Sequence, residues 1–348
     1  MTFSDISDHQ DKVVSLYDEM KKKYSTYLMV ADDVQVPVER TDKTWLVKCP
    51  KRPGICKGTF DAPALMSVLR RIRKEKFDVI FFETLHVWNL PILLLAGKNT
   101  TTYQMIHDVI PHSGDSGAKM VDLMNKTVCK IADNIIICNE KYKNALCDRY
   151  HISEKRVFST PLWEKFPEYN YVKRTGKVLF FGRLNPYKGV NNLLKLVDLC
   201  PEISFDVIGK ADPQVQNIID ELKTKKNVTL NNEYVKEEEI QGIFENSDWI
   251  LLPYNSATQS GIVLDSYKFS KPVLAFEVGA ISEQVVDGVS GYLITPGDVM
   301  KFAEKLKDLM KMTDDDYEKI CYSAYKYGYD NFAITSTVDR FVSIFFGE

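Results

Sequence analysis

The chain has 348 residues, of which 45% are hydrophobic and 27% charged, an ordinary globular composition with more sequence than one domain core usually holds. Its net charge of −3 hides an asymmetry, because residues 1–175 carry 27 Lys and Arg against 22 Asp and Glu, which leaves 18 against 26 for the remainder. No basic stripe with interleaved aromatic residues accompanies this balance, so we expect no nucleic-acid partner.

Cysteine usage and apolar runs predict a cytoplasmic protein without a membrane span. The seven cysteines form no CxxC pair and no metal-ligand spacing, which is typical of reduced, buried thiols. The polar start MTFSDISDHQ is unlike a signal peptide. The longest apolar run, Leu90–Gly97, contains Pro91 and is far shorter than a membrane span.

Helical and extended patterns alternate through the first half, which predicts an α/β domain with a parallel sheet. Such a domain normally opens with a buried strand and a glycine turn, but this chain opens in a polar turn, Thr2–Gln10, with His9 near the place of that glycine turn. We expect either that the first strand is lost or that the start is truncated. The predicted helices are 12–23, 64–76, 87–96, 119–131 and 141–150, and the predicted strands are 26–31, 77–82, 102–106 and 134–138.

The second half repeats this alternation after a linker at 161–175, which has no periodicity. The predicted strands are 178–181, 204–208, 228–230, 249–252 and 272–275, and the predicted helices are 191–199, 214–225, 236–245, 261–269, 299–310, 315–327 and 335–346. The sequence therefore predicts two Rossmann-like domains facing a cleft, with strand ends and helix N-termini turned toward it, where open α/β sheets bind ligands.

The first chemical motif is FFGRLNPYKG, in which an apolar strand runs into Gly182. Arg183 and Lys188 follow at the carboxyl end of the strand, directly before a predicted helix. A helix N-terminus offers free N–H groups and partial positive charge, Arg adds a planar fork for phosphate oxygens, and Lys adds a point charge. We interpret the two cations as a diphosphate clamp, with solvated surface cations as the alternative.

The second motif is LLPYNSATQSGIVLDSYKFSKPVLAFEVGAISEQVVDGVSGYLITPGD. A strand ends at Tyr254, and the turn Ser256–Ser260 leads to a helix N-terminus near Gly261, where small polar side chains suit a sugar or its phosphates. After the next strand, Gly279 allows the backbone to approach a ligand closely. Three consecutive βα turns thus carry chemistry that suits a ligand.

These motifs resemble the nucleotide-sugar-dependent retaining glycosyltransferases of family 4, which have the GT-B fold. The resemblance is dense over 178–298 and thinner in the first domain, where IHDVIPHSGD (106–115) occupies a place that faces the acceptor in the family. It implies an acceptor-side domain over 1–165, a nucleotide-sugar-binding domain over 176–330, and a last segment, 331–348, whose helix returns to the first domain.

The resemblance implies a hexosyltransferase that moves a sugar from a nucleoside diphosphate, of UDP or GDP type, to a glycan or lipid-linked saccharide, commonly in surface polysaccharide biosynthesis. We expect no bound cofactor and no metal, since positive side chains take the place of Mg²⁺ at the departing diphosphate. The implied catalytic residues are Arg183, Lys188, His107 and Asp108; the donor-binding residues are Gly182, Tyr254, Thr258, Gln259, Ser260, Gly261, Ile262, Gly279 and Glu283; the acceptor-side residues are Glu83, His86 and His112.

The chain departs from the family at two glutamates that usually flank GIVL, whose places are taken by Thr258 and Ser266. Asp265 stands beside the second place, but neighbours on a helix point about 100° apart, so we expect it to face elsewhere. Contact with the sugar then falls to Thr258, Gln259 and Ser260. The departure leaves open a second hypothesis, a catalytically degenerate GT-B protein that serves as a partner subunit of a glycosyltransferase.

Other enzyme classes lack their signatures. No GxGxxG follows a strand, as a nicotinamide dehydrogenase would need, and neither the acid/base carboxylates of an epimerase nor the lysine of a pyridoxal phosphorylase is visible. Basic residues cluster at 21–23 and 70–76. They fit an anionic membrane surface, such as the inner face of the plasma membrane, and equally fit a solvated helix face.

Overall fold

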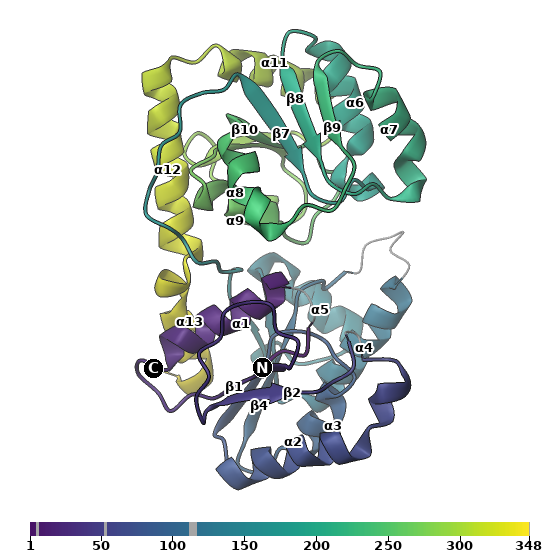
Figure 1. The fold of residues 1–348 in the computed structure, drawn as a ribbon, viewed down its shortest axis with the longest axis vertical. Coiled ribbons are helices and arrows are strands. Elements are labelled where there is room, and N and C mark those ends of the chain that lie inside the picture. Colours follow the sequence, from purple (N-terminus) through teal and green to yellow (C-terminus); the bar gives the residue numbers. More distant parts are fainter. Residues whose placement is uncertain (5–6, 52–53, 111–116, 348) are drawn as a thin grey trace. The chain divides into compact units, whose positions relative to one another are not determined.

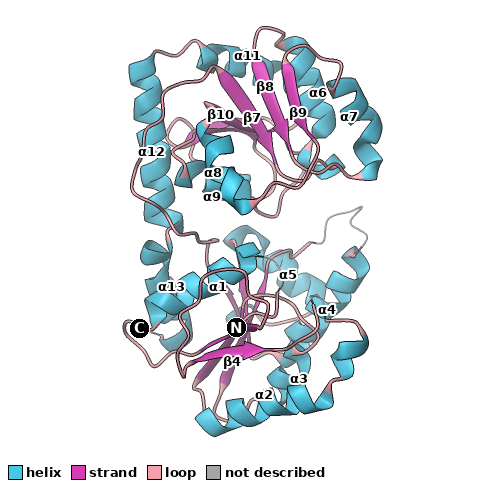
Figure 2. Ribbon diagram, viewed as in Figure 1, coloured by secondary structure: helices cyan, strands magenta, loops and turns pink. Residues whose placement is uncertain are grey.

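The computed structural model describes residues 1–4, 7–51, 54–110 and 117–347, which Figure 1 colours along the sequence. Contacts between Cα atoms divide the chain into two compact units: unit 1 is Met1–Glu164 with Ile334–Glu348, and unit 2 is Lys165–Ala333. Each unit is built from helices packed on parallel sheets (Figure 2), so the predicted α/β class with Rossmann-like domains is confirmed. The cleft between the domains stays a prediction. Among the described residues, no helix is long and apolar enough to cross a membrane.

Unit 1 contains two parallel sheets, ordered β1-β2 and β3-β4-β5-β6. The strands are β1 (Leu28–Ala31), β2 (Thr44–Val47), β3 (Val79–Phe82), β4 (Thr101–Ile106), β5 (Asn134–Ile137) and β6 (Val157–Ser159). The helices are α1 (Ser7–Met20), α2 (Ala62–Glu75), α3 (Asn89–Leu95), α4 (Ala118–Ile131), α5 (Lys143–Tyr150) and α13 (Ile334–Phe346), with short 3₁₀ turns η1 (Lys57–Phe60), η2 (Glu140–Tyr142) and η3 (Glu154–Arg156). Strands β2 and β6 were not predicted.

Local sequence explains these elements. Asp61 caps α2 by accepting a hydrogen bond from the Ala64 N–H at 3.1 Å, and the helix buries Val68, Leu69 and Ile72 on one face. The three isoleucines of β5 are buried, as β-branched side chains in the middle of a parallel sheet usually are. The polar turns that connect strands to helices are thereby left at the carboxyl edge of the sheet.

The amino-terminal segment, Met1–Ser4, is not the polar turn that the sequence predicts. Thr2 forms a parallel bridge with Val30 of β1, and the Glu83 N–H beyond β3 donates to the Met1 carbonyl at 3.0 Å. The segment therefore lies between β1 and β3 and connects the two sheets. Because α1 follows this segment and β3 lies beside it, the first residues of α1 and the residues after β3 lie at the same edge of the sheet.

Unit 2 contains one six-stranded parallel sheet, ordered β12-β11-β10-β7-β8-β9. The strands are β7 (Lys177–Phe181), β8 (Ser204–Ile208), β9 (Val228–Asn231), β10 (Trp249–Leu252), β11 (Val273–Phe276) and β12 (Gly291–Ile294). The helices are α6 (Val190–Leu199), α7 (Gln216–Leu222), α8 (Glu237–Glu245), α9 (Gly261–Lys268), α10 (Ile281–Gln284), α11 (Val299–Met310) and α12 (Asp314–Phe332), with 3₁₀ turns η4 (Pro186–Lys188) and η5 (Pro213–Val215). Strand β12 was not predicted.

The order of the strands in unit 2 places a switch point beside β7. From β7 the chain builds outward through β8 and β9, then returns to the other side of β7 and builds through β10, β11 and β12. Open α/β sheets bind ligands where the carboxyl ends of two such strands diverge. The first place to look for a ligand in unit 2 is thus the turns that follow β7 and β10.

The last helix, α13, belongs to unit 1, although it follows unit 2 in the sequence. The Ile334 N–H donates to the Glu164 carbonyl at 2.9 Å, where the chain leaves and re-enters this unit. The ring of Phe341 then packs edge-on against Trp163, with ring centroids 4.8 Å apart, and lies 5.7 Å from Phe81. Aromatic packing of this kind holds the helix on the sheet.

Candidate functional site

The turn after β7 brings the two predicted clamp cations to the switch point of unit 2. Gly182 has a φ of +100°, and a Cβ atom on it would lie 2.5 Å from the Lys188 Nζ. The Asn185 side chain caps the short 3₁₀ turn by accepting from the Lys188 N–H at 3.2 Å. Because Gly182 has no side chain, the Lys188 side chain can lie against the end of β7. Arg183 is exposed.

The turn after β10 is tied directly to the turn after β7. The Asn255 N–H donates to the Tyr187 carbonyl at 2.8 Å, and Asn192 Nδ2 donates to the Pro253 carbonyl at 2.9 Å. Gly189, with a φ of +75°, packs so closely that a Cβ atom would lie 1.9 Å from the Pro253 oxygen. Backbone contact at this distance needs a glycine, so the sequence KG in the first motif fixes both turns.

The turn after β11 joins the same group. The Ala280 N–H donates to the Ala257 carbonyl at 3.1 Å. Gln284 forms two bonds to Ser260: its Oε1 accepts from the Ser260 N–H at 2.8 Å, and its Nε2 donates to the Ser260 carbonyl at 3.0 Å. Three βα turns therefore form one hydrogen-bonded surface at the carboxyl ends of β7, β10 and β11.

The two cations of this surface form no ion pair with a carboxylate among the described residues. Neither Arg183 nor Lys188 forms an ion pair within the part of the chain that the structure describes, and the Lys188 Nζ lies 5.5 Å from the centroid of the Tyr254 ring. Burial and the nearby charge of Arg183 lower the pKa of Lys188 to about 8. A phosphate anion would relieve both effects, so the turns have the electrostatics of an anion site.

Asp265, which we expect to face away from the sugar, acts on the clamp through its charge, which opposes the lowering of the Lys188 pKa. Asp265 follows Ile262 by three residues on α9, and Ile262 Cδ1 lies 3.5 Å from the Cβ position of Gly182, so both occupy the face turned to the clamp. Ser266 instead is fully buried, and its hydroxyl donates to the Ile262 carbonyl at 2.6 Å.

The other predicted donor residues differ in exposure. Thr258 and Ser260 are buried, Gly261 and Glu283 are exposed, and Gly279 has a φ of +53°. The side-chain oxygen of Gln259 is buried without a hydrogen-bond partner among the described residues. Since buried polar atoms are nearly always paired, this oxygen marks a place for a ligand hydroxyl.

In unit 1 the structure joins three residues from separate turns. Glu83 follows β3 and is fully buried; its Oε1 atom lies 2.8 Å from His9 Nδ1 and 2.9 Å from His107 Nε2. His107 follows β4, and its Nδ1 lies 3.6 Å from the Cys138 Sγ. We call these residues, His9, Glu83 and His107, the histidine–glutamate cluster. It lies at the switch point between the amino-terminal segment and β3.

The cluster carries its own counter-charge. Burial alone would raise the pKa of Glu83, but the two imidazoles outweigh it and lower the pKa well below the usual range. Burial likewise would lower the pKa of His107, yet Cys138 and Glu83 together raise it well above 6.5. The carboxylate of Glu83 therefore favours the protonated form of His107 and holds its ring in place through Oε1.

The remaining acceptor-side predictions fare differently. His86 has no exposed surface; its Nε2 lies 2.9 Å from the Pro50 carbonyl and its Nδ1 accepts from the Trp88 N–H at 3.1 Å, so it is a core residue that cannot reach an acceptor. Asp108 is half-buried beside His107, and its carbonyl accepts from Asn125 Nδ2. His112 lies outside the described residues. No local signal could have found His9, because its partner lies 74 residues away.

The histidine–glutamate cluster is also where metal-ligating atoms converge, since its three ligand atoms lie within 4.8 Å of one another. Tetrahedral Zn²⁺ with bonds of about 2.0–2.1 Å separates its ligand atoms by roughly 3.4 Å. The distances of 2.8 and 2.9 Å between the ring nitrogens and the carboxylate are shorter than this and have hydrogen-bond length. The residues present therefore fit a shared proton better than a metal ion.

Two Rossmann-like units with polar switch points define the class of protein, a GT-B fold. The structure is similar to that of HepE from Anabaena in complex with UDP-glucose, with a TM-score of 0.73 and 16% identity, covering 100% of this chain and 99% of HepE. Residues 162–327 match the family described as Glycosyl transferases group 1. The chain thus has the GT-B fold, and its second unit carries the match to the group 1 glycosyl transferases, so the resemblance seen in the sequence is confirmed for the fold and for this family match.

Two relatives match the chain in sequence. An uncharacterized 41.2 kDa protein in the cps region of Klebsiella pneumoniae is 23% identical over 259 residues, which are 68% of this chain and 70% of that protein. D-inositol 3-phosphate glycosyltransferase of Corynebacterium urealyticum is 24% identical over 172 residues, which are 44% of this chain and 40% of the enzyme. The chain thus spans less than half the length of the second relative.

Proposed function

We propose that the protein is a retaining hexosyltransferase that uses a nucleoside diphosphate sugar, of UDP or GDP type, and a glycan or lipid-linked saccharide acceptor. One observation carries the proposal: Lys188 is a half-buried cation that forms no ion pair among the described residues, and a glycine turn holds it beside Arg183. A lysine kept in this state at a switch point is suited to an anion that arrives from solution, such as the diphosphate of a donor.

In the proposed reaction the bond between the anomeric carbon and the diphosphate oxygen breaks as the bond to the acceptor oxygen forms on the same face. The acceptor proton passes to the departing phosphate. Arg183 and Lys188 stabilise the negative charge that accumulates on this leaving group, which is the largest electrostatic task of the step. The two side chains supply the charge that a divalent metal supplies elsewhere, so we propose a metal-independent enzyme.

The sugar of the donor would bind over the turn after β10. Thr258 and Ser260 supply hydroxyls there, and Gln259 supplies the buried, unpartnered oxygen that can accept a hydroxyl proton. Asp265 would take the role of the second family glutamate, because its charge acts on the clamp cation Lys188. The acceptor would meet His107 and Asp108 of unit 1, with His107 kept charged by Glu83.

The comparisons favour this substrate class. HepE was solved with UDP-glucose, and the Klebsiella relative is encoded in a cps region. We therefore propose a place in the synthesis of a surface polysaccharide, at the cytoplasmic side of the membrane.

A degenerate partner subunit is the second candidate, and the burial of Ser266 favours it. This residue stands where the family has a glutamate for the ribose, and its hydroxyl is spent on the Ile262 carbonyl. A protein of this kind would keep the fold but not bind a nucleotide tightly.

A thermal-shift titration with UDP, GDP, dTDP and ADP, followed by their sugar conjugates, separates the two candidates. A ligand at ~100 times its dissociation constant adds about 2.7 kcal/mol of stability. We expect one nucleotide to raise the melting temperature and the Arg183→Ala variant to abolish this shift. No shift with any nucleotide would favour the degenerate subunit. If one nucleotide does raise the melting temperature, release of free sugar from its sugar conjugate tests for turnover.

We also propose that α2 contacts anionic lipid. Arg70, Arg73 and Lys74 are exposed on this helix, whereas Lys21 and Lys22 are paired with carboxylates of their own unit. Charge reversal of the three α2 residues should lower binding to vesicles that contain anionic lipid, most clearly at low salt. Charge reversal at Lys21 and Lys22 is the matched control. If it lowered vesicle binding as much as charge reversal on α2 does, the basic face of α2 would be an ordinary solvated helix face.

A further inference from the structure

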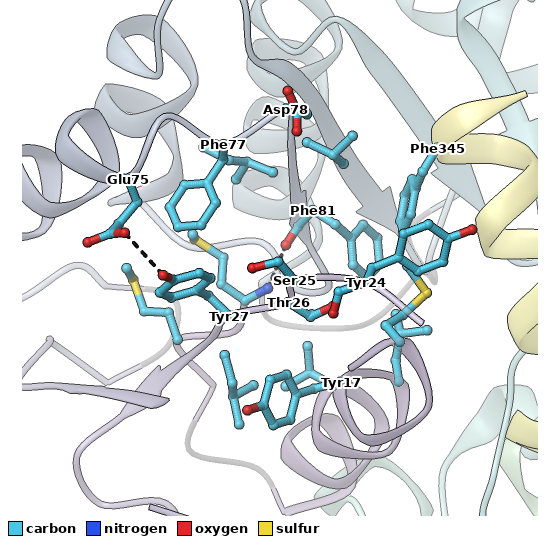
Figure 3. A pocket seen from close by; sticks show the side chains of 18 of the residues that line it. Tyr17, Tyr24, Ser25, Thr26, Tyr27, Glu75, Phe77, Asp78, Phe81 and Phe345 are labelled. Carbon is cyan, nitrogen blue, oxygen red and sulfur yellow. Dashed lines mark hydrogen bonds between the residues drawn. The ribbon is translucent and has the colours of Figure 1, made fainter. Parts of the chain in front are cut away.

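Unit 1 has two cavities of nearly equal volume that differ in charge. The first, of about 380 Å³, appears in Figure 3, where Phe77 and Phe81 form part of its aromatic wall. Its charged lining residues are Glu75, Lys76 and Asp78, so carboxylates outnumber cations and disfavour an anionic ligand. The second, of about 370 Å³, lies where α2 and α3 end, and there basic and apolar side chains meet.

The second cavity is lined by residues from both helices. Arg73 belongs to the last turn of α2, Leu94 and Leu95 form the end of α3, and Lys98 follows that helix. The Arg73 Nε–H donates to the Leu95 carbonyl at 3.4 Å, so the guanidinium lies at the carboxyl end of α3, which is close to α2 in Figure 1. We call these four residues the leucine–cation groove.

Both kinds of side chain in the leucine–cation groove face solvent. Leu94 is 66% exposed and Leu95 is 41% exposed, which leaves two adjacent apolar side chains at one helix end in water. Arg73 and Lys98 are also exposed, and neither forms an ion pair among the described residues. Apolar surface next to unpaired charge of one sign is typical of a docking surface.

The surroundings keep the groove positive. Asp133 is the carboxylate in the cavity lining, and its Oδ2 accepts from the N–H of Thr102 at 2.9 Å and from the hydroxyl at 2.7 Å. Along α2, Met66, Arg70 and Lys74 follow one another at four-residue steps and are all exposed. The mixture of apolar and basic side chains thus continues from the groove along one side of α2.

The groove is separate from the histidine–glutamate cluster. Thr102, near the start of β4, lines the cavity, whereas His107 follows the end of that strand. Five residues of extended chain at ~3.3 Å each place the two about 16 Å apart. An acceptor bound at the cluster therefore leaves the groove free for another partner.

We propose that the leucine–cation groove docks unit 1 on an anionic lipid bilayer, as the apolar anchor of the lipid contact proposed for α2. Leu94 and Leu95 enter the boundary between headgroups and acyl chains, and Arg73 and Lys98 bind lipid phosphates there. Charge complementarity selects this partner, because a soluble anion would leave both leucines in water and an uncharged apolar partner would leave both cations unpaired. The inference rests on that part of the proposed function and adds which residues enter the bilayer.

The first test reads the depth of one residue in vesicles of phosphatidylglycerol and phosphatidylcholine, made with and without brominated acyl chains. The four native tryptophans are buried, so an indole introduced at an exposed position reports on its own surroundings. We expect the emission of the Leu94→Trp variant to move to shorter wavelength and to be quenched by the brominated chains. The matched control is Leu123→Trp on α4, where the native leucine is 58% exposed, and its emission should not change.

The second test separates the apolar part of the groove from the basic part by salt. Leu94→Ser combined with Leu95→Ser should lower the partition of the full chain onto these vesicles at least about tenfold, and the loss should persist at high salt because apolar burial is not screened. Arg73→Glu combined with Lys98→Glu should lower partition at low salt, with an effect that shrinks as salt rises. Leu123→Ser should leave partition unchanged, and all variants should keep the parent melting temperature because these side chains are exposed.

Three outcomes would overturn the proposal. They are an unquenched Leu94→Trp variant, a double serine variant that partitions as well as Leu123→Ser, and equal binding of the parent protein to vesicles of phosphatidylcholine alone. Vesicle binding is measured without nucleotide, and the nucleotide titration is measured without lipid. A failure of the groove is thereby distinguished from a failure of the donor site.

Discussion

The two switch points of this protein handle charge in opposite ways. In unit 1, Glu83 is fully buried between two imidazoles, and the charges of the cluster neutralise one another. In unit 2, Lys188 and Arg183 repel each other, and burial lowers the pKa of the lysine. The same kind of sheet edge therefore holds a carboxylate paired with imidazoles in one unit, although Glu83 Oε2 has no hydrogen-bond partner among the described residues, and two neighbouring cations in the other.

The difference suits the two units to different tasks: charged groups in unit 1 position their neighbours, and charged groups in unit 2 are available to bind a ligand. A buried charge with its partner in place costs little to keep and gives its neighbours a fixed geometry. A buried charge without a partner costs stability that only a ligand can return. The contrast indicates that unit 2 is the place where an anion arrives, and that unit 1 presents groups that are already arranged.

The largest expected effect comes from removing the two neighbouring cations. Lys188→Met and Arg183→Ala should each lower the initial rate of sugar transfer by about 10²–10³-fold, because each removes charge from the leaving group. Since burial of Lys188 costs stability, Lys188→Met should leave the melting temperature unchanged or raise it. The matched control is Lys195→Met, an exposed lysine on α6. If both clamp variants transferred sugar as fast as the parent protein, the two cations would not serve the reaction, and the contrast between the two switch points would have no functional meaning.

Breaking the pairing of carboxylate and imidazoles should lower stability first and activity second. Glu83→Gln removes the charge between two imidazoles, so unfolding should become easier by about 3 kcal/mol, with transfer lowered about 100-fold. The stability due to the carboxylate is present above its ordinary pKa of 4.5 and lost as pH falls, whereas that due to His107 is present below 6.5 and lost as pH rises through its raised pKa. Denaturant unfolding across pH measures both.

Glu154→Gln, an exposed carboxyl of the same unit, is the control for that variant. If Glu83→Gln changed transfer without changing the pH dependence of stability, the cluster would not be the charged pair described above.

The pH dependence of nucleotide binding should identify Lys188 itself. With a pKa of about 8 in the free protein, the lysine loses its proton between pH 7 and 9, while a bound diphosphate raises the pKa and keeps the proton. Affinity should therefore be nearly full at pH 7 and about tenfold weaker at pH 9. Titration calorimetry at both values measures it. Lys188→Arg, which stays charged, should bind with little change over this range.

The smallest effect concerns the backbone that joins the turns. Gly189→Ala places a methyl group 1.9 Å from the Pro253 oxygen at a φ of +75°, so it should destabilise unit 2 by about 2 kcal/mol and weaken nucleotide binding as the turns separate. Gly242→Ala, in α8 with open space at its Cβ position, should be neutral or stabilising by up to about 1 kcal/mol. Equal melting temperatures for the two variants would contradict the close packing of the turns.

The sequence predicts elements best where burial is continuous. Strands β8 and β10 begin and end as predicted: β10 is the apolar run WILL, buried throughout, and β8 buries its three central residues. Strand β2 was missed because its four residues, TWLV, are too short for periodicity to reveal. The amino-terminal segment was misread because its pairing with β1 and β3 is made by backbone, which leaves no pattern in the side chains.

The same limit applies to the sites. The clamp of unit 2 is visible in sequence because its glycine and two cations lie within one turn. The histidine–glutamate cluster is assembled from turns after different strands, so only the fold reveals that His9 joins Glu83.

The return of α13 to unit 1 affects how the protein is made. Unit 2 is one uninterrupted segment, whereas unit 1 needs residues from both ends of the chain. During synthesis unit 2 has its whole sequence available while unit 1 still lacks the helix that covers Phe81 and Trp163. The usual amino-to-carboxyl order of domain folding is thus reversed: the half that holds the nucleotide-site cations can be complete on the ribosome before the half that was translated first.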